Sequence, residues 1–233
     1  MELQESVLRS IGGIVGWKAS PRYADYRGRL TERLLELVGP EGDWSWDGPG
    51  TLVYSEEREV SVAISPTELV IFSDTTAPDL GSLPGEVASM VLEQLAIPEV
   101  QLIGSGSSWL AAASSEEDLN SWLAESLGSL GRAGLYDPFG GRPNSFAFQA
   151  GIGDDDLGYE IELKPMTASE AAAGEDLMSD DEADFPSIAL YLEVRRAKVG
   201  ELKSSDAVQW FGESLEKNLI AAQKFDAALR EDL

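Results

Sequence analysis

The sequence contains neither cysteine nor histidine among its 233 residues. Without cysteine there is no disulfide bond, no thiol nucleophile and no zinc–thiolate site. Without histidine there is no Ser-His-Asp or Cys-His catalysis, no histidine general base and no histidine-ligated metal or haem. Catalysis would therefore depend on carboxylates, lysine, tyrosine, serine or threonine, and we expect no cofactor.

Long apolar segments are also missing. The runs at residues 11–17 and 69–72 are typical, far below the ~20 residues that a membrane-spanning helix requires. The first ten residues are partly acidic and lack the basic and then apolar pattern of a secretory signal peptide. We therefore expect a cytoplasmic protein that does not enter a membrane.

Positive charge is scarce. The chain has 42 acidic and 17 basic side chains, which gives a formal net charge of −25. Residues 1–131 contribute −14 and residues 132–233 contribute −11, so the acidity belongs to the whole surface. Such a field repels nucleic acid and anionic membranes, and it attracts basic proteins. A basic protein partner is therefore expected, although an adaptation to solubility or high salt would give the same composition.

The hydrophobic content of 43% is sufficient for an ordinary core. Periodicity predicts an α+β protein in which helices pack on antiparallel sheets. Two loosely similar halves are expected, residues 1–131 and 132–233, each with strands followed by a helix, or else one continuous domain. The predicted helices span residues 2–16, 23–38, 84–95, 115–130 and 205–229. The predicted strands span residues 51–55, 59–65, 68–73, 100–103, 109–113, 145–150, 158–163 and 187–195, and residues 164–186 are predicted to form a long surface loop.

Within residues 23–130 the predicted order of elements is α-β-β-β-α-β-β-α. This order resembles the small module of type III secretion chaperones, which are also acidic and catalytically inert. The resemblance is carried by element order. It implies a scaffold that binds another protein.

Two motifs resemble catalytic fingerprints but lack their context. Residues 104–109 begin like a GxGxxG loop, with tryptophan in place of the third glycine and a strand instead of a helix after it, so we expect a hairpin turn. Ser214 and Lys217 match Ser-x-x-Lys, but they lie within a predicted helix, and the companion motifs of that enzyme class do not occur.

Acidic and aromatic clusters are the remaining candidate sites. Carboxylates at Asp154, Asp155 and Asp156, and at Asp180 and Asp181, are of the type that binds Mg²⁺ or Ca²⁺, but their spacing matches no EF-hand. These residues are therefore interpreted as solvated acidic loops that a partner could contact. Trp44 and Trp46 lie on one side of an extended chain, where they would either cover the core or form a contact surface.

The leading hypothesis is a non-enzymatic protein whose acidic surface recognises a basic protein partner, as immunity proteins, secretion chaperones and accessory subunits do. Two alternatives remain open. A DNA mimic would present its carboxylates in an elongated array on one face. A divalent-metal enzyme would bring Asp154, Asp155 and Asp156 together with distant carboxylates.

Overall fold

A computed structural model describes residues 6–39, 42–45, 50–74, 80–126, 148–154, 157–167 and 188–231. These ranges contain four helices: α1 (Arg22–Val38), α2 (Leu83–Gln94), α3 (Glu116–Ser126) and α5 (Ser204–Glu231). They also contain nine strands: β1 (Val7–Gly16), β2 (Asp43–Ser45), β3 (Thr51–Ser55), β4 (Val60–Ile64), β5 (Glu68–Ser73), β6 (Glu99–Ala112), β7 (Phe148–Asp154), β8 (Leu157–Thr167) and β9 (Ile188–Lys203).

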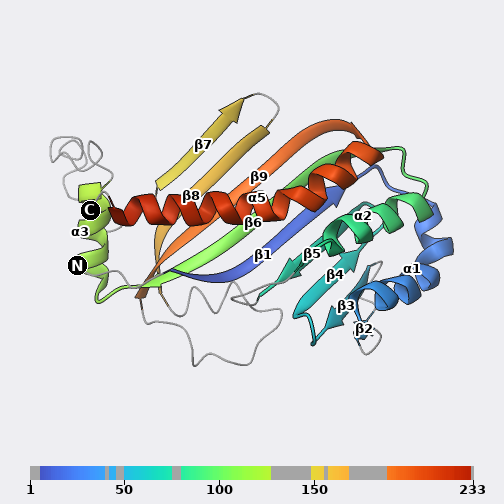
Figure 1. The fold of residues 1–233 in the computed structure, drawn as a ribbon, viewed down its shortest axis with the longest axis horizontal. Coiled ribbons are helices and arrows are strands. Elements are labelled where there is room, and N and C mark those ends of the chain that lie inside the picture. Colours follow the sequence, from blue (N-terminus) through green and yellow to red (C-terminus); the bar gives the residue numbers. More distant parts are fainter. Residues whose placement is uncertain are drawn as a thin grey trace.

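All nine strands belong to one antiparallel sheet, in the order β2-β3-β4-β5-β1-β6-β9-β8-β7 (Figure 1). The pair β1–β6 lies at its centre, and β6 also pairs with β9, so early and late parts of the chain share the sheet. The predicted α+β class, with antiparallel strands and a long C-terminal helix, is confirmed. The predicted boundary near residue 131 lies outside the described residues, and the division into domains stays a prediction.

The described elements follow the same order twice. The unit β1–α1–β3–β4–β5–α2 is followed by β6–α3–β7–β8–β9–α5, and β2 is an addition to the first unit. In the sheet, β3-β4-β5-β1 continues into β6-β9-β8-β7, which is the arrangement that a twofold axis between β1 and β6 would produce. These units meet between α2 and β6, at residues 95–98, and not near residue 131, and each begins with a strand and a helix that the expected plan of strands followed by a helix lacked.

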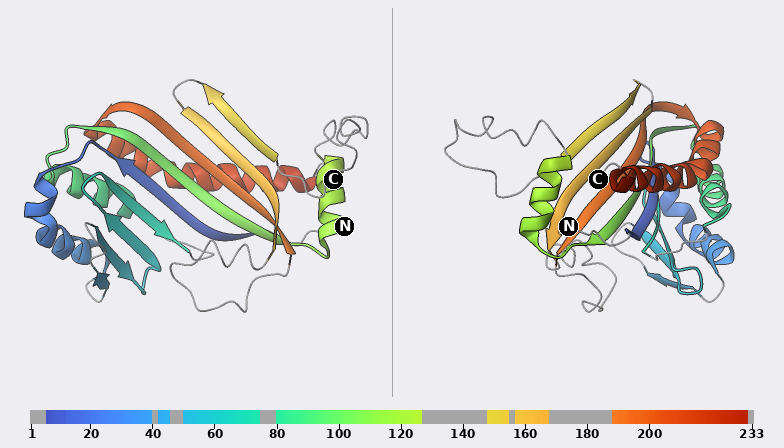
Figure 2. Two further views of the ribbon diagram at one scale, coloured as in Figure 1. Left: turned by 180° about the vertical axis from the view of Figure 1, so that it is seen from behind. Right: turned by 60° about the vertical axis from the view of Figure 1, so that its left-hand side comes forward.

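Helices α1, α2 and α5 cover one face of the sheet, which we call the helix face (Figure 1). The opposite face, which we call the rear face, is turned toward the viewer in the left panel of Figure 2. Alternate strand residues such as Val15, Ile71 and Ile103 are fully buried under the helices. Helix α3 contacts β8. None of the described helices combines the length and the apolar character that spanning a membrane requires.

Glycines allow α5 to lie close to its neighbours. Gly13 of β1 points toward α5, and a Cβ there would lie only 2.5 Å from Cε2 of Phe211, which is fully buried. A Cβ at Gly85 of α2 would lie 3.6 Å from the Cα of Gly212 on α5, so these two helices approach each other at glycines. Helix α5 therefore packs on α2 and on the centre of the sheet.

Several predicted elements are confirmed. Helix α1 ends at Val38, as the predicted helix over residues 23–38 does, with Gly39 at φ +154° and its N–H bonded to the carbonyl of Leu35 at 3.0 Å. Strands β3, β4 and β5 match the strands predicted over residues 51–55, 59–65 and 68–73, and they pair as a meander. Helix α3 corresponds to the helix predicted over residues 115–130, and at its start the backbone N–H of Asp118 donates to the Ser115 hydroxyl at 3.1 Å. Strands β7 and β8 overlap the strands predicted over residues 145–150 and 158–163 and pair with each other, and α5 matches the longest predicted helix.

The prediction of a helix over residues 2–16 is wrong, because residues 7–16 form the central strand β1. The error has a physical cause. A register shift between Leu8 and Ser10 interrupts the alternation, so Leu8 and Ile11 are both buried although they are three residues apart. That spacing imitates a helix, whereas a bulge in the strand produces it.

The predicted hairpin within residues 100–113 is also wrong. Strand β6 is continuous from Glu99 to Ala112, and its glycines and serines lie in mid-strand instead of in a turn. Between α2 and α3 the order is therefore one strand and not two, and the chaperone resemblance stays a prediction. Small residues occur in this strand because α5 lies close to one side of it and a groove lies on the other.

Candidate binding groove

A groove of about 430 Å³ lies at the centre of the rear face. Its lining comes from β1, β5, β6 and β9, which are brought together only by the sheet. Rear-face residues follow from the register, because residues paired across antiparallel strands point to the same side. The groove therefore combines residues from both topological units.

Three glycines form the floor of the groove. Gly12 of β1 pairs with Gly106 of β6, and Ile14 of β1 pairs with Gly104, so Gly12, Gly104 and Gly106 lie together at the rear of the β1–β6 pair. A Cβ at Gly12 would come within 2.9 Å of the Ile71 carbonyl oxygen, so packing alone requires this glycine. The other two are different. A Cβ at Gly106 would meet nothing closer than 3.7 Å, and one at Gly104 nothing closer than 3.4 Å.

One wall of the groove is apolar. Val70 and Phe72 of β5, Ile14 of β1 and Leu102 of β6 line it. Val199 of β9 pairs with Leu102 and therefore points to the same face, where it is 80% exposed. An isolated exposed valine is ordinary, but this one lies beside Leu102 of the apolar wall.

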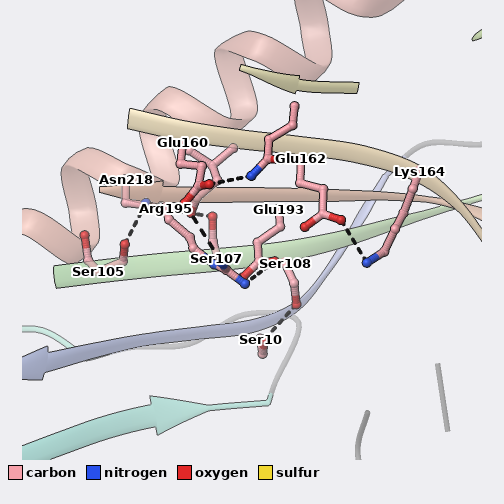
Figure 3. A network of polar contacts seen from close by, with 12 residues as sticks. Ser10, Ser105, Ser107, Ser108, Glu160, Glu162, Lys164, Glu193, Arg195 and Asn218 are labelled. Carbon is pink, nitrogen blue, oxygen red and sulfur yellow. Dashed lines mark hydrogen bonds and ion pairs between the residues drawn. The ribbon is translucent and has the colours of Figure 1, made fainter. Parts of the chain in front are cut away.

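The opposite wall is polar and comes from β9. Arg195 donates to both carboxylate oxygens of Glu193, from Nε at 2.6 Å and from Nη2 at 2.9 Å (Figure 3). Only 18% of the Glu193 side chain is exposed. Burial, and then the Glu193 carboxylate, raise the pKa of Tyr191 well above its usual value, so its hydroxyl stays protonated. The hydrogen bond with Glu193 raises the pKa of Arg195, so its guanidinium stays charged.

The polar wall continues onto β8 as an acidic rim, which we define as Glu160, Glu162 and Glu193 (Figure 3). Glu162 pairs directly with Glu193 across the strands, and Glu160 pairs with Arg195. Lys164 donates to Glu162 at 2.9 Å, and Nη1 of Arg195 lies 4.0 Å from Glu160. The three carboxylates therefore exceed the two cations by one negative charge.

The helix side of the same strands contains a closed polar network. Asn218 of α5 accepts from the Ser107 hydroxyl at 2.6 Å and donates to the Val194 carbonyl at 2.9 Å. The Ser105 hydroxyl donates to the Ser214 carbonyl at 3.2 Å. All of these side chains are buried, and they attach α5 to β6 and β9. Their hydrogen bonds are used in folding, so this network is structural.

Beside this network lies Arg196, which is buried under α5. Its guanidinium stacks between the rings of Trp210 and Tyr159, at 4.9 and 5.6 Å from their centroids. Cation–π contacts of this kind stabilise a desolvated guanidinium. The side chains of Arg195 and Arg196, although adjacent in sequence, therefore lie on opposite faces of the sheet.

Most residues singled out in the sequence are not brought together in the described structure. Trp44 lies on the edge strand β2, where it is 51% exposed, and Trp46 lies outside the described residues. Asp154 is the last residue of β7. The positions of Asp155, Asp156, Asp180 and Asp181 are also outside the described residues. The contact and metal-binding hypotheses for these residues therefore stay predictions.

The residues of the two motifs that resemble catalytic fingerprints have structural roles. The glycines of residues 104–109 lie within β6 and do not precede a helix. The Ser214 hydroxyl is buried and donates to the Phe211 carbonyl at 3.1 Å, whereas Lys217 binds Glu213 on the exposed side of α5. Among the residues with described side chains, no group of three or more aspartates or glutamates is arranged to hold a metal ion.

The groove was not found by sequence reasoning, because its glycines are about ninety residues apart in the chain. The only local signal was the unusual run of glycine and serine in β6. The sequence matches no model of a known protein family and no curated protein. The interpretation of the groove therefore depends on its geometry and charge.

Proposed function

We propose that this protein is a non-enzymatic cytoplasmic binding protein whose rear face receives a segment of a basic protein partner. The observation that carries the proposal is the glycine-floored groove, with its apolar wall on one side and the acidic rim on the other. An apolar groove that receives the apolar side of a partner segment is a recurring form of protein recognition.

A role in binding explains Gly104 and Gly106 better than a role in packing does. Glycine weakens a strand interior by about 0.5–1 kcal/mol relative to alanine. Gly104 and Gly106 carry this cost although a Cβ would fit at both positions. Their effect on the structure is to keep the floor of the groove flat and its volume free for an occupant.

The charge supports a basic occupant. The net charge of −25 attracts basic proteins over long distances, and the acidic rim places an excess of carboxylates beside the groove. Glu193, the most buried carboxylate of the rim, already accepts two hydrogen bonds from Arg195. This engagement favours a recognition role for the pair over general-base chemistry.

The experiment compares the proteins captured from the native host by tagged wild type, Gly106→Ala and Gly106→Val. The valine methyl groups would project into the groove from a position where the Cβ itself fits. We expect wild type to retain one stoichiometric basic protein, less of it as salt is raised, and Gly106→Val to lose it. Gly28→Ala, an exposed position on α1, is the control that should retain the partner.

Unchanged thermal unfolding would show that Gly106→Val is folded, so that loss of capture reports on the groove. Capture of the same partner by Gly106→Val at wild-type levels would refute the proposal. If duplex DNA displaces the captured protein, the rear face acts as a DNA mimic instead. A small molecule that co-purifies in place of a protein would also overturn the proposal.

A further inference from the structure

We infer that the occupant of the groove is an amphipathic helix of a basic protein, with an apolar anchor at one end and basic side chains about 20 Å away. The inference rests on the proposed function and specifies its partner. It follows from the polarity of the rear face along the strands. On the β6, β9 and β8 side of the groove, Leu102 and Val199 lie toward one end of the strands and the acidic rim toward the other.

The apolar end contains Leu102 and Val199. These two residues pair across β6 and β9, and Val199 is the most exposed large apolar side chain among the described residues. Immediately after it, the register shifts and Gly200 adopts φ +133°. This irregularity ends the regular pairing next to Val199, whose side chain lies on the rear face beside Leu102 of the groove lining. An exposed valine contributes little to folding, so its apolar surface is available to an anchor residue.

The acidic end contains the acidic rim. Glu162 and Glu193 are direct cross-strand partners, and like charges in this position are unfavourable by themselves. Lys164 and Arg195 compensate two of the three carboxylates. One further cation, supplied by an occupant, would neutralise the rim.

The distance between the two ends comes from strand geometry. Val199 and Glu193 are six residues apart on β9, and at about 3.3 Å per residue this corresponds to roughly 20 Å. A helix rises 1.5 Å per residue, so about 13 residues would connect the two ends. The anchor and the basic residues of the partner should therefore be about 13 positions apart.

The face of a sheet favours a helix over an extended segment. Its backbone N–H and C=O groups already pair within the sheet, so an extended peptide lying on it would bury unsatisfied backbone groups. A helix satisfies its own backbone. The walls are also far enough apart, because Gly12 and Gly106 lie between Phe72 of the apolar wall and Arg195 of the polar wall. Three strand spacings of about 4.8 Å give roughly 14 Å, which is wider than the diameter of a helix, about 10 Å.

The test uses fluorescein-labelled helical peptides of about 16 residues, and their binding is followed by fluorescence anisotropy. The complete peptide carries leucine and phenylalanine in its first turn and two lysines about 13 residues later. In the second peptide the lysines are glutamine, and in the third the apolar residues are alanine. In the fourth peptide the lysines directly follow the anchor.

We expect the complete peptide to bind wild type and each altered peptide to bind at least about tenfold more weakly, as loss of an anchor or of charge pairing predicts. Val199→Ser should weaken the complete peptide and leave its salt dependence unchanged. Glu160→Gln combined with Glu162→Gln should weaken it and reduce its salt dependence. Arg29→Gln on α1, away from the groove, is the control and should change neither property.

The outcomes separate this inference from the proposed function. If Gly106→Val abolishes capture of the native partner but all four peptides bind equally or none binds, the helix inference is wrong and the proposed function stands. If the fourth peptide binds as tightly as the complete one, the 20 Å separation is wrong. If wild type is a dimer that Gly106→Val converts to a monomer, a second copy of the chain occupies the groove and the inference fails.

Discussion

The close approach of Gly13 to Phe211 yields a sharp prediction about stability. In the Gly13→Ala variant, the new methyl group would lie 2.5 Å from Cε2 and 2.9 Å from Cζ of the Phe211 ring, and 3.0 Å from the Gly104 carbonyl oxygen. Ordinary carbon–carbon contacts are about 3.5–4.0 Å. The ring must therefore move by about an ångström, although it is fully buried and carried by α5.

The expected cost follows from two opposing effects. Overpacking a core of this density costs about 1–3 kcal/mol. Replacing glycine by alanine in a strand returns about 0.5–1 kcal/mol. Because a backbone oxygen also restricts the new methyl group, the cost should fall at the upper end. We expect a net destabilisation of about 2 kcal/mol, which corresponds to a decrease in Tm of roughly 4–8 °C for a chain of this size.

The assay is thermal unfolding followed by circular dichroism, and Gly106→Ala is the matched control. Gly106 lies on the neighbouring central strand, but its Cβ would meet only ordinary contacts at 3.7 Å on the rear face. The same chemical change should therefore be neutral or stabilising there. Phe211→Leu should cost less in the Gly13→Ala background than in wild type, because the two changes share one contact. An unchanged Tm for Gly13→Ala, or strict additivity of the double variant, would refute the packing argument.

Two further predictions concern groups with buried polar atoms. Asn218→Ala should destabilise by about 2–3 kcal/mol in the same thermal assay, because the Val194 carbonyl and the Ser107 hydroxyl each lose a buried hydrogen bond; a change within error would show that the network contributes nothing. The raised pKa of Tyr191 means that the unfolded chain ionises first as pH increases above about 10. Stability should then decrease by at most about 1.4 kcal/mol per pH unit. Tyr191→Phe should remove this part of the alkaline decrease, and equal pH profiles for both proteins would contradict the assigned shift.

The sequence by itself determined the elements whose signals are local. Helix α1 has a buried stripe and ends at Gly39, and the β3–β4–β5 meander alternates regularly between short turns. In these segments the residue pattern, the turn residues and the tertiary environment all favour the same structure. The net charge and the lack of histidine and cysteine likewise follow from composition, and they excluded whole classes of chemistry.

Only the tertiary structure decided the centre of the sheet and the groove. The bulge after Leu8 gives the buried residues of β1 a helix-like spacing. The glycines of β6 suggested a turn, whereas in the structure they lie in mid-strand, with α5 on one side of the sheet and the groove on the other. Gly12 and Gly106 become neighbours only through the pairing of β1 with β6. A strand of glycine and serine has little intrinsic preference for its conformation. Its conformation is therefore fixed by strand pairing and packing, which no local sequence pattern encodes. For that reason the residues that form the groove could not be recognised before the sheet was known.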